Sequence, residues 1–295
     1  MPRELVYLRN ARFPSGELVG RAGARVSPDD RGFVFGDGVY EVIRSYSGRL
    51  FQAEAHMERL RTSLAAVRID AQDTADLVDI AMDLLDRNGL AGADALVYMQ
   101  VTRGTAPRAH PFPSPAVLPT LYVSTTPFAL PNELQEEGVG VATLSDFRWA
   151  RCDIKTVSLQ ANVLALQHAK EQGARECVFI RDGAVTEGTH ANFMGVVDGV
   201  VRTHPATNHI LAGITRAVVL GICARERISV REEALTETEL RVLDEAFLTA
   251  TSFEVTPVVC INGRPVGSGR PGPTTARLQA LFKQAVEALP SGRKP

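Results

Sequence analysis

Lysine is scarce in this chain of 295 residues. Of its 32 lysines and arginines, only Lys155, Lys170, Lys283 and Lys294 are lysines. The last three lie in segments that are typical of solvated surface. Lys155 instead follows an isoleucine and leads into an apolar run. A lysine amine can lose its proton and attack a carbonyl group, which a guanidinium cannot do, so Lys155 is the first candidate for chemistry.

Long hydrophobic runs and an excess of one charge are also missing. The longest apolar runs, such as residues 217–223, are far too short to span a bilayer, and no apolar signal-peptide core follows Met1. The formal net charge of −2 gives no reason to expect nucleic acid as a partner. We therefore expect a cytoplasmic protein with no membrane or nucleic-acid partner.

Metal-binding and disulfide patterns are absent from the sequence. The cysteines, at positions 152, 177, 223 and 260, have no CxxC spacing, and the six histidines form no HExxH or HxH arrangement. Reduced thiols fit this scatter better than a disulfide framework or a zinc site. We expect no metal.

Two common catalytic signatures are lacking, and a third matches in sequence but lacks the strand and helix context that it needs. No GxSxG or P-loop pattern occurs, which counts against a serine hydrolase and P-loop phosphotransfer. Residues 267–272 match GxGxxG, but the motif contains a proline and no second βαβ strand can follow it so near the chain end. We interpret this stretch as a surface loop.

The pattern of apolar residues predicts two mixed α/β domains. Strand-like runs at 5–9, 39–46, 50–52, 95–102 and 120–125, with helical patterns at 54–67 and 74–88, predict a small domain over residues 1–126. A proline-bracketed linker covers 127–135. A larger domain follows over 136–295, with predicted helices at 213–227 and 275–289. Before these helices, Leu159, Val163 and Leu166 fall on one face of a further helix that Gly173 ends.

Two short stretches of the second domain suit a cofactor, although each also has a structural explanation. Leu211–Thr215 opens a helix with glycine, amides and a hydroxyl, as a phosphate site requires, but many helices carry such residues only as caps. Glu187 follows a strand-like run, where it could pair with a cationic ligand nitrogen or cap the turn.

The loop 102–113 is the most unusual in the chain. Arg108 and His110 alternate in a segment stiffened by prolines at 107, 111 and 113. Alternate residues of an extended segment point the same way, so these two side chains could form one anion clamp. A reactive lysine, a carboxylate, a phosphate cradle and an anion clamp together describe a pyridoxal phosphate site that acts on an amino acid.

Six motifs then resemble a known family, in family order across nearly the whole chain. They are Asp30–Glu41, Val101–His110, Arg151–Lys155, Val185–Gly188, Gly213–Arg216 and Thr249–Pro257. The chain resembles the fold type IV pyridoxal-phosphate enzymes, and within them the D-amino acid aminotransferases. The resemblance implies a mixed α/β (α+β) fold whose two domains hold pyridoxal 5'-phosphate at their interface, with the lysine in the larger C-terminal domain.

The resemblance also implies residue roles. Lys155 would hold the cofactor as a Schiff base and carry the catalytic proton, and Glu187 would face the ring nitrogen. Tyr40 would contact the substrate beside the Schiff base of Lys155. Arg108 and His110 would reach in from the other subunit of a homodimer and fix the substrate carboxylate in the D orientation. The remaining implied cofactor contacts are Arg59, Leu211, Gly213, Ile214, Thr215 and Thr251.

The implied reaction transfers an amino group from D-alanine and other D-amino acids to 2-oxoglutarate by a ping-pong route. An L-branched-chain aminotransferase or an aminodeoxychorismate lyase of the same fold is the alternative, although the former usually has a tyrosine where Gln160 stands. A non-catalytic metabolite-binding protein would have little use for Lys155. His190 and Phe253 depart from the family pattern and put the range of substrates in question.

Overall fold

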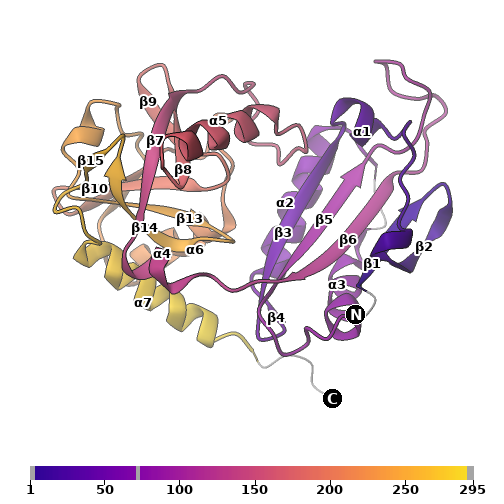
Figure 1. Ribbon diagram of the computed structural model, residues 1–295, viewed down its shortest axis with the longest axis horizontal. Helices are drawn as coiled ribbons and strands as arrows, with labels where there is room; N and C mark the ends of the chain where they lie inside the picture. Colours follow the sequence, from indigo (N-terminus) through magenta and orange to yellow (C-terminus); the bar gives the residue numbers. More distant parts are fainter. Residues whose placement is uncertain (1–3, 71–73, 291–295) are drawn as a thin grey trace. The chain divides into compact units, whose positions relative to one another are not determined.

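The computed structural model describes residues 4–70 and 74–290. The chain forms two compact units (Figure 1). The first comprises the described residues of Met1–Ala129 and Leu289–Pro295 together with Ile154–Ser158, and the second comprises Leu130–Asp153 and Leu159–Ala288. Each unit contains both helices and a sheet, and each has its own apolar core.

The first unit is an antiparallel sheet with two helices packed on it. The strand order is β2-β1-β6-β5-β3-β4. Alternation along β5 buries Val97, Met99 and Val101 in the core, so that Tyr98 and Gln100 lie on the opposite face. The elements are β1 (Leu5–Asn10), β2 (Phe13–Gly20), α1 (Arg31–Phe35), β3 (Gly38–Tyr46), β4 (Arg49–Leu50), α2 (Ala53–Ala66), α3 (Leu77–Arg87), β5 (Ala95–Thr102) and β6 (Thr120–Pro127).

The second unit is built on a nine-stranded sheet of order β12-β11-β10-β13-β14-β7-β8-β9 with β15 paired to β14. An additional pairing of β10 with β9 closes β10, β13, β14, β7, β8 and β9 into a barrel. The strands are β7 (Val139–Ser145), β8 (Glu176–Arg181), β9 (Ala184–Gly188), β10 (Asn192–Val197), β11 (Val200–Thr203), β12 (Val230–Arg231), β13 (Glu245–Ala250), β14 (Glu254–Ile261) and β15 (Arg264–Pro265). The helices are α4 (Asn132–Glu136), α5 (Gln160–Glu171), α6 (Ile214–Arg225) and α7 (Pro273–Glu287).

The strip that carries Lys155 differs from the sequence prediction. The sequence assigned it to the second domain, whereas residues 154–158 belong with the first unit. Backbone hydrogen bonds explain the difference, because the Tyr40 amide donates to the Lys155 carbonyl and the Val157 amide to the Gly38 carbonyl, each at 3.0 Å. The strip is therefore held beside the start of β3.

Helix α5 buries a different face from the predicted one. Val163, expected on the apolar face with Leu159 and Leu166, is exposed, and the fully buried positions are Ala165 and Ala169. These alanines pack against Phe179 of β8 because their small side chains let the helix approach the sheet closely. In the part of the chain that the structure describes, no helix is both long and apolar enough to cross a membrane.

The GxGxxG stretch has a structural explanation. A side chain at Gly272 would collide with the Glu245 carboxylate. That carboxylate accepts the amides of Thr274 at 2.9 Å and Thr275 at 2.8 Å, so it already occupies the N-terminus of α7. The glycine makes room for a helix cap supplied by the protein itself.

Candidate active site

The Lys155 amine lies against an aromatic face in the first unit. Its Nζ is 4.2 Å from the centroid of the Tyr40 ring, a favourable position for a cation. Tyr40 stacks on Tyr98 at 5.7 Å between ring centroids, and the Tyr98 hydroxyl donates to Gln100 Oε1 at 2.6 Å. Burial raises the pKa of Tyr98 to about 12, so this phenol stays protonated. Lys155 and Tyr40, both predicted from the sequence, are brought together.

Arg59 is fixed by a buried carboxylate on β3. Its Nε and Nη2 donate to the two oxygens of Glu41 at 2.6 and 2.8 Å, and His56 Nδ1 lies 2.8 Å from the same carboxylate. Burial alone would raise the pKa of Glu41, but the hydrogen bonds from Arg59 and His56 outweigh it and lower the pKa to about 2. Glu41 therefore stays ionised and sets the direction of the Arg59 side chain.

Arg108 and His110 meet at one aromatic ring. The Arg108 guanidinium carbon lies 5.2 Å from the Phe35 ring centroid, and the His110 and Phe35 centroids are 5.5 Å apart. Both side chains are exposed. The structure thus brings the two predicted clamp residues to the same ring of α1, and both side chains are accessible to an anion.

The Arg31 guanidinium holds the backbone of the loop that carries Arg108 and His110. Arg31 Nη1 donates to the carbonyl of Ala109 at 2.5 Å and to that of Pro111 at 3.4 Å, while Nη2 donates to the carbonyl of His110 at 3.3 Å. Arg31 is itself paired with Asp37, 2.8 Å away. Arg31 and Asp37 were not predicted from the sequence as site residues, although both lie in the motif Asp30–Glu41.

In the second unit, three donors surround the Glu187 carboxylate. Oε1 accepts from Arg148 at 2.6 Å, and Oε2 accepts the Leu211 amide at 3.0 Å and Asn192 Nδ2 at 3.2 Å. Burial raises the pKa of Glu187 to about 7, although Arg148 opposes the shift. A carboxylate has about four lone-pair positions, so one remains for a further N–H group.

The start of α6 forms a close-fitting cradle. Gly213 is the N-cap, and a Cβ there would overlap Asn192 Oδ1. The amides of Ile214 and Thr215 fall in the first turn, where no carbonyl of the helix can accept them. Thr249, paired with Asn192 across β13 and β10, has a buried hydroxyl with no hydrogen-bond partner in the described residues. Thr251 follows in the half-buried turn after β13.

Each unit thus gathers its own predicted residues. Lys155 and Tyr40 meet in the first unit, and Glu187, Leu211 and Gly213 meet in the second. Arg148 and Asn192, which also contact Glu187, were not predicted from the sequence. The charged residues after β7 could have indicated Arg148, and the asparagine at the start of β10 could have indicated Asn192. In the described ranges no group of three or more His, Cys, Asp or Glu residues is placed to hold a metal ion.

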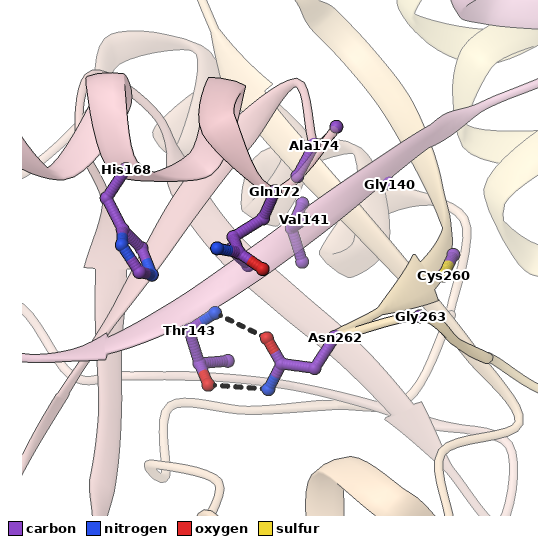
Figure 2. A pocket seen from close by; sticks show the side chains of 11 residues that line it. Gly140, Val141, Thr143, His168, Gln172, Ala174, Cys260, Asn262 and Gly263 are labelled. Carbon is purple, nitrogen blue, oxygen red and sulfur yellow. Dashed lines mark hydrogen bonds between the residues drawn. The ribbon is translucent and has the colours of Figure 1, made fainter.

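The second unit also has a hollow of about 660 Å³ near the C-terminal end of α5. Figure 2 shows Thr143 and Asn262 at this hollow, hydrogen-bonded to each other through the Thr143 amide at 2.8 Å and hydroxyl at 2.7 Å. None of the residues predicted from the sequence lines it. Because these two polar side chains satisfy each other, they offer little to a ligand.

The match of residues 38–261 to the family model of amino-transferase class IV defines the class of protein. The matched range includes the aromatic face, Lys155, Glu187 and the start of α6. The chain belongs to this family of aminotransferases.

Relatives within the family are similar over almost their whole length. The chain is 42% identical over 280 residues to a D-alanine aminotransferase of Staphylococcus haemolyticus, covering 95% of this chain and 99% of the relative. It is 42% identical over 273 residues to a D-alanine aminotransferase of Bacillus licheniformis, covering 92% and 95%.

Solved structures show the same fold. A branched-chain amino acid aminotransferase from Escherichia coli superposes with a TM-score of 0.87 at 25% identity, over 99% of this chain and 97% of that one. The T.th. branched-chain amino acid aminotransferase, complexed with N-(5'-phosphopyridoxyl)-L-glutamate, gives 0.84 at 26% identity over 99% and 96%. These comparisons confirm the family and the fold class predicted from the sequence.

Proposed function

We propose that the protein is a D-amino acid aminotransferase, which transfers the amino group of D-alanine and other D-amino acids to 2-oxoglutarate, giving 2-oxo acids and D-glutamate. The observation that carries the proposal is the 42% identity to D-alanine aminotransferases over 95% of the chain. The approach of Arg108 and His110 to the same Phe35 ring supports it, because a guanidinium and an imidazole N–H group both donate hydrogen bonds to a carboxylate.

Pyridoxal 5'-phosphate fits the residues present. Lys155 would hold it covalently, and the open lone pair of Glu187 suits a ring N–H. The Ile214 and Thr215 amides, the space kept by Gly213 and the unpartnered Thr249 hydroxyl suit a phosphate at the start of α6. We propose that Arg59, Leu211 and Thr251 complete the contacts with the cofactor.

The bound cofactor supplies an aldehyde for amine exchange and a ring that accepts electrons. This chain's residues do the rest. Lys155 Nζ would take the proton from the substrate Cα and deliver it to the cofactor carbon, and Glu187 would keep the ring nitrogen protonated. Tyr40 borders the lysine amine at 4.2 Å. Arg108 and His110 hold the α-carboxylate, which decides the face that Nζ reaches.

A homodimer is part of the proposal. Arg108 and His110 would serve the site of the partner subunit, as the family resemblance implies, so that a single chain would be incomplete. A cytoplasmic location stays a prediction from the sequence.

The test is turnover by the cofactor-loaded protein with 2-oxoglutarate and either D-alanine or L-leucine as donor. We expect pyruvate and D-glutamate from D-alanine and little reaction with L-leucine. Branched-chain amino acid aminotransferases are among the structural neighbours, so turnover of L-leucine alone would favour that activity. Pyruvate formed from aminodeoxychorismate without a keto acid would favour the lyase.

A further inference from the structure

His190 is oriented by a buried carboxylate. Its Nδ1 lies 2.8 Å from Glu176 Oε2, and Glu176 is fully buried whereas 39% of the His190 side chain is exposed. Glu176 Oε1 accepts the Cys177 amide at 2.7 Å and the Thr189 amide and hydroxyl at 3.1 and 2.5 Å. In the described part of the chain, His190 is the only side chain placed to balance the negative charge at Oε2, which accepts no hydrogen bond.

The pair leaves the second ring nitrogen of His190 available to a ligand. Burial would raise the pKa of Glu176, but His190 and the Thr189 hydroxyl lower it, so the carboxylate remains ionised. Nδ1 lies 3.1 Å from the Thr189 hydroxyl and 2.8 Å from Glu176 Oε2, so it is engaged on the protein side. An imidazolium held in this way presents Nε2–H as a donor to an anion. No hydrogen bond to Nε2 is found among the described residues. The ring is supported by Phe253, whose centroid is 4.9 Å away and whose side chain is buried.

The position of His190 connects it with the proposed site. It lies at the tip of the tight turn between Glu187 and Asn192, which is closed by the Gly188 amide donating to the Ala191 carbonyl at 2.6 Å. Glu187 and Asn192 are hydrogen-bonded to each other. A side chain at Gly188 would crowd the Glu176 carboxylate, with 3.2 Å to its Cγ, so the glycine lets this carboxylate pass beneath the turn. Phe253 comes two residues after Thr251.

The proposed reaction needs one more anion-binding group. D-Alanine and pyruvate carry one carboxylate, whereas D-glutamate and 2-oxoglutarate carry two, and Arg108 with His110 accounts for one. We propose that His190, positioned by Glu176 and Phe253, is a subsite for the side-chain carboxylate of dicarboxylic substrates. This inference rests on the proposed function, and it concerns the substrate range of the same site.

The test compares glutarate with butyrate, which lacks the second carboxylate, by calorimetric titration of the cofactor-loaded protein. We expect glutarate to bind at least about tenfold more tightly than butyrate, as for a charge-assisted hydrogen bond. The variant His190→Phe keeps a ring against Phe253 and should lose this preference. His190→Ser provides a second variant without the ring, and His168→Asn is a control histidine elsewhere in the unit.

Kinetics provide the second measurement. His190→Phe should raise KM for 2-oxoglutarate about tenfold, while KM for a monocarboxylic acceptor such as 2-oxobutyrate, with D-alanine as donor, stays within about twofold. Glu176→Gln should raise KM for 2-oxoglutarate in the same direction without changing kcat, because it acts through His190.

Several results would overturn the subsite. They are equal binding of glutarate and butyrate by the unchanged protein, an unchanged preference in both His190 variants, or a loss of cofactor affinity that weakens both ligands equally. A His190-dependent glutarate preference in a protein that turns over no D-amino acid would refute the proposed function and keep the subsite. Turnover of D-alanine by a protein without that preference would refute the subsite and keep the proposed function.

Discussion

Glu41 is the residue on which the charges of the first unit depend. It is fully buried between β3 and α2 and faces two basic side chains, Arg59 and His56. A buried carboxylate is stable only when such partners replace the water it has lost. Its function is indirect, because it fixes the direction of Arg59, a proposed cofactor contact.

The stability contributed by Glu41 should depend on pH. Its pKa is about 2 in the folded protein against an ordinary value of 4.5, so the stabilisation is complete above about pH 4.5 and is lost as the pH falls toward 2. Glu41→Gln should lower the free energy of unfolding by about 3 kcal/mol at pH 7. Denaturant unfolding between pH 7 and pH 3.5 should show this difference shrinking, and a difference that does not change with pH would contradict the assignment.

Single residues stand out in the sequence where their type is unusual. Lys155 does so because lysine is rare in the chain, and Glu187 because it follows a strand before small polar residues, and the roles of both stay predictions. Arg148 and Asp146, which stabilise the Glu187 region, were not found. Arg148 is 39 positions from Glu187, and their contact depends on β7 and β9 entering one barrel, which local sequence patterns do not reveal.

The clamp loop depends on one helix turn. Arg31 of α1 donates to the carbonyls of Ala109, His110 and Pro111, an arrangement that only a guanidinium spans. We expect Arg31→Lys to raise KM for D-alanine about tenfold with kcat within about twofold, because the loop would lose its fixed orientation. Steady-state kinetics measure this, with the exposed Arg87→Lys as control. An unchanged KM, or a loss confined to kcat, would refute this role.

Helix α6 offers a matched pair of glycines. Gly213 has an ordinary φ of −68°, so space alone excludes a side chain there, whereas a Cβ at Gly221 has no neighbour within 4 Å. Gly213→Ala should lower stability by about 2 kcal/mol and weaken cofactor binding, since it would push Asn192 away. Gly221→Ala should stabilise the helix by up to about 1 kcal/mol.

Thermal unfolding and cofactor titration test this pair of variants. Equal behaviour of the two would mean that the start of α6 is not the close-fitting cradle that the structure shows.

Elements with a clear apolar period were predicted well, and those set by tertiary contacts were not. The strand expected at 95–102 agrees with β5, and the helix expected at 54–67 agrees with α2 to within one residue at each end. The buried face of α5 was predicted wrongly, because Ala165 and Ala169 are too small to dominate an apolar pattern. Strand β2, with glycine and proline in it, gave no strand pattern at all.

At the scale of the whole molecule, chain order and spatial grouping differ. Lys155 lies in the sequence between β7 and α5 of the second unit, yet its backbone pairs with β3. The closing of β9 onto β10 is another long-range feature. Neither follows from composition or periodicity, since both depend on which strand edges remain unpaired. The resemblance of motifs supplied the fold class instead.

The proposed homodimer leads to a complementation experiment. If Lys155 of one subunit works with Arg108 of the other, then Lys155→Ala and Arg108→Ala variants, each inactive, should form a mixed dimer with one intact site. Random exchange of equal amounts should restore about a quarter of the activity. Activity assays after co-refolding measure it. If no activity returns while mixed dimers are present, the two residues act within the same subunit.

The central claim is that Lys155 and its surroundings process D-amino acids through a bound pyridoxal phosphate. The most direct test is the visible absorption spectrum of the cofactor-loaded protein, mixed separately with D-alanine and L-leucine, beside the Lys155→Ala variant. We expect D-alanine alone to abolish the band of the lysine-bound cofactor, and the variant never to show that band. Loss of the band with L-leucine alone, or an unaltered band in Lys155→Ala, would contradict the account.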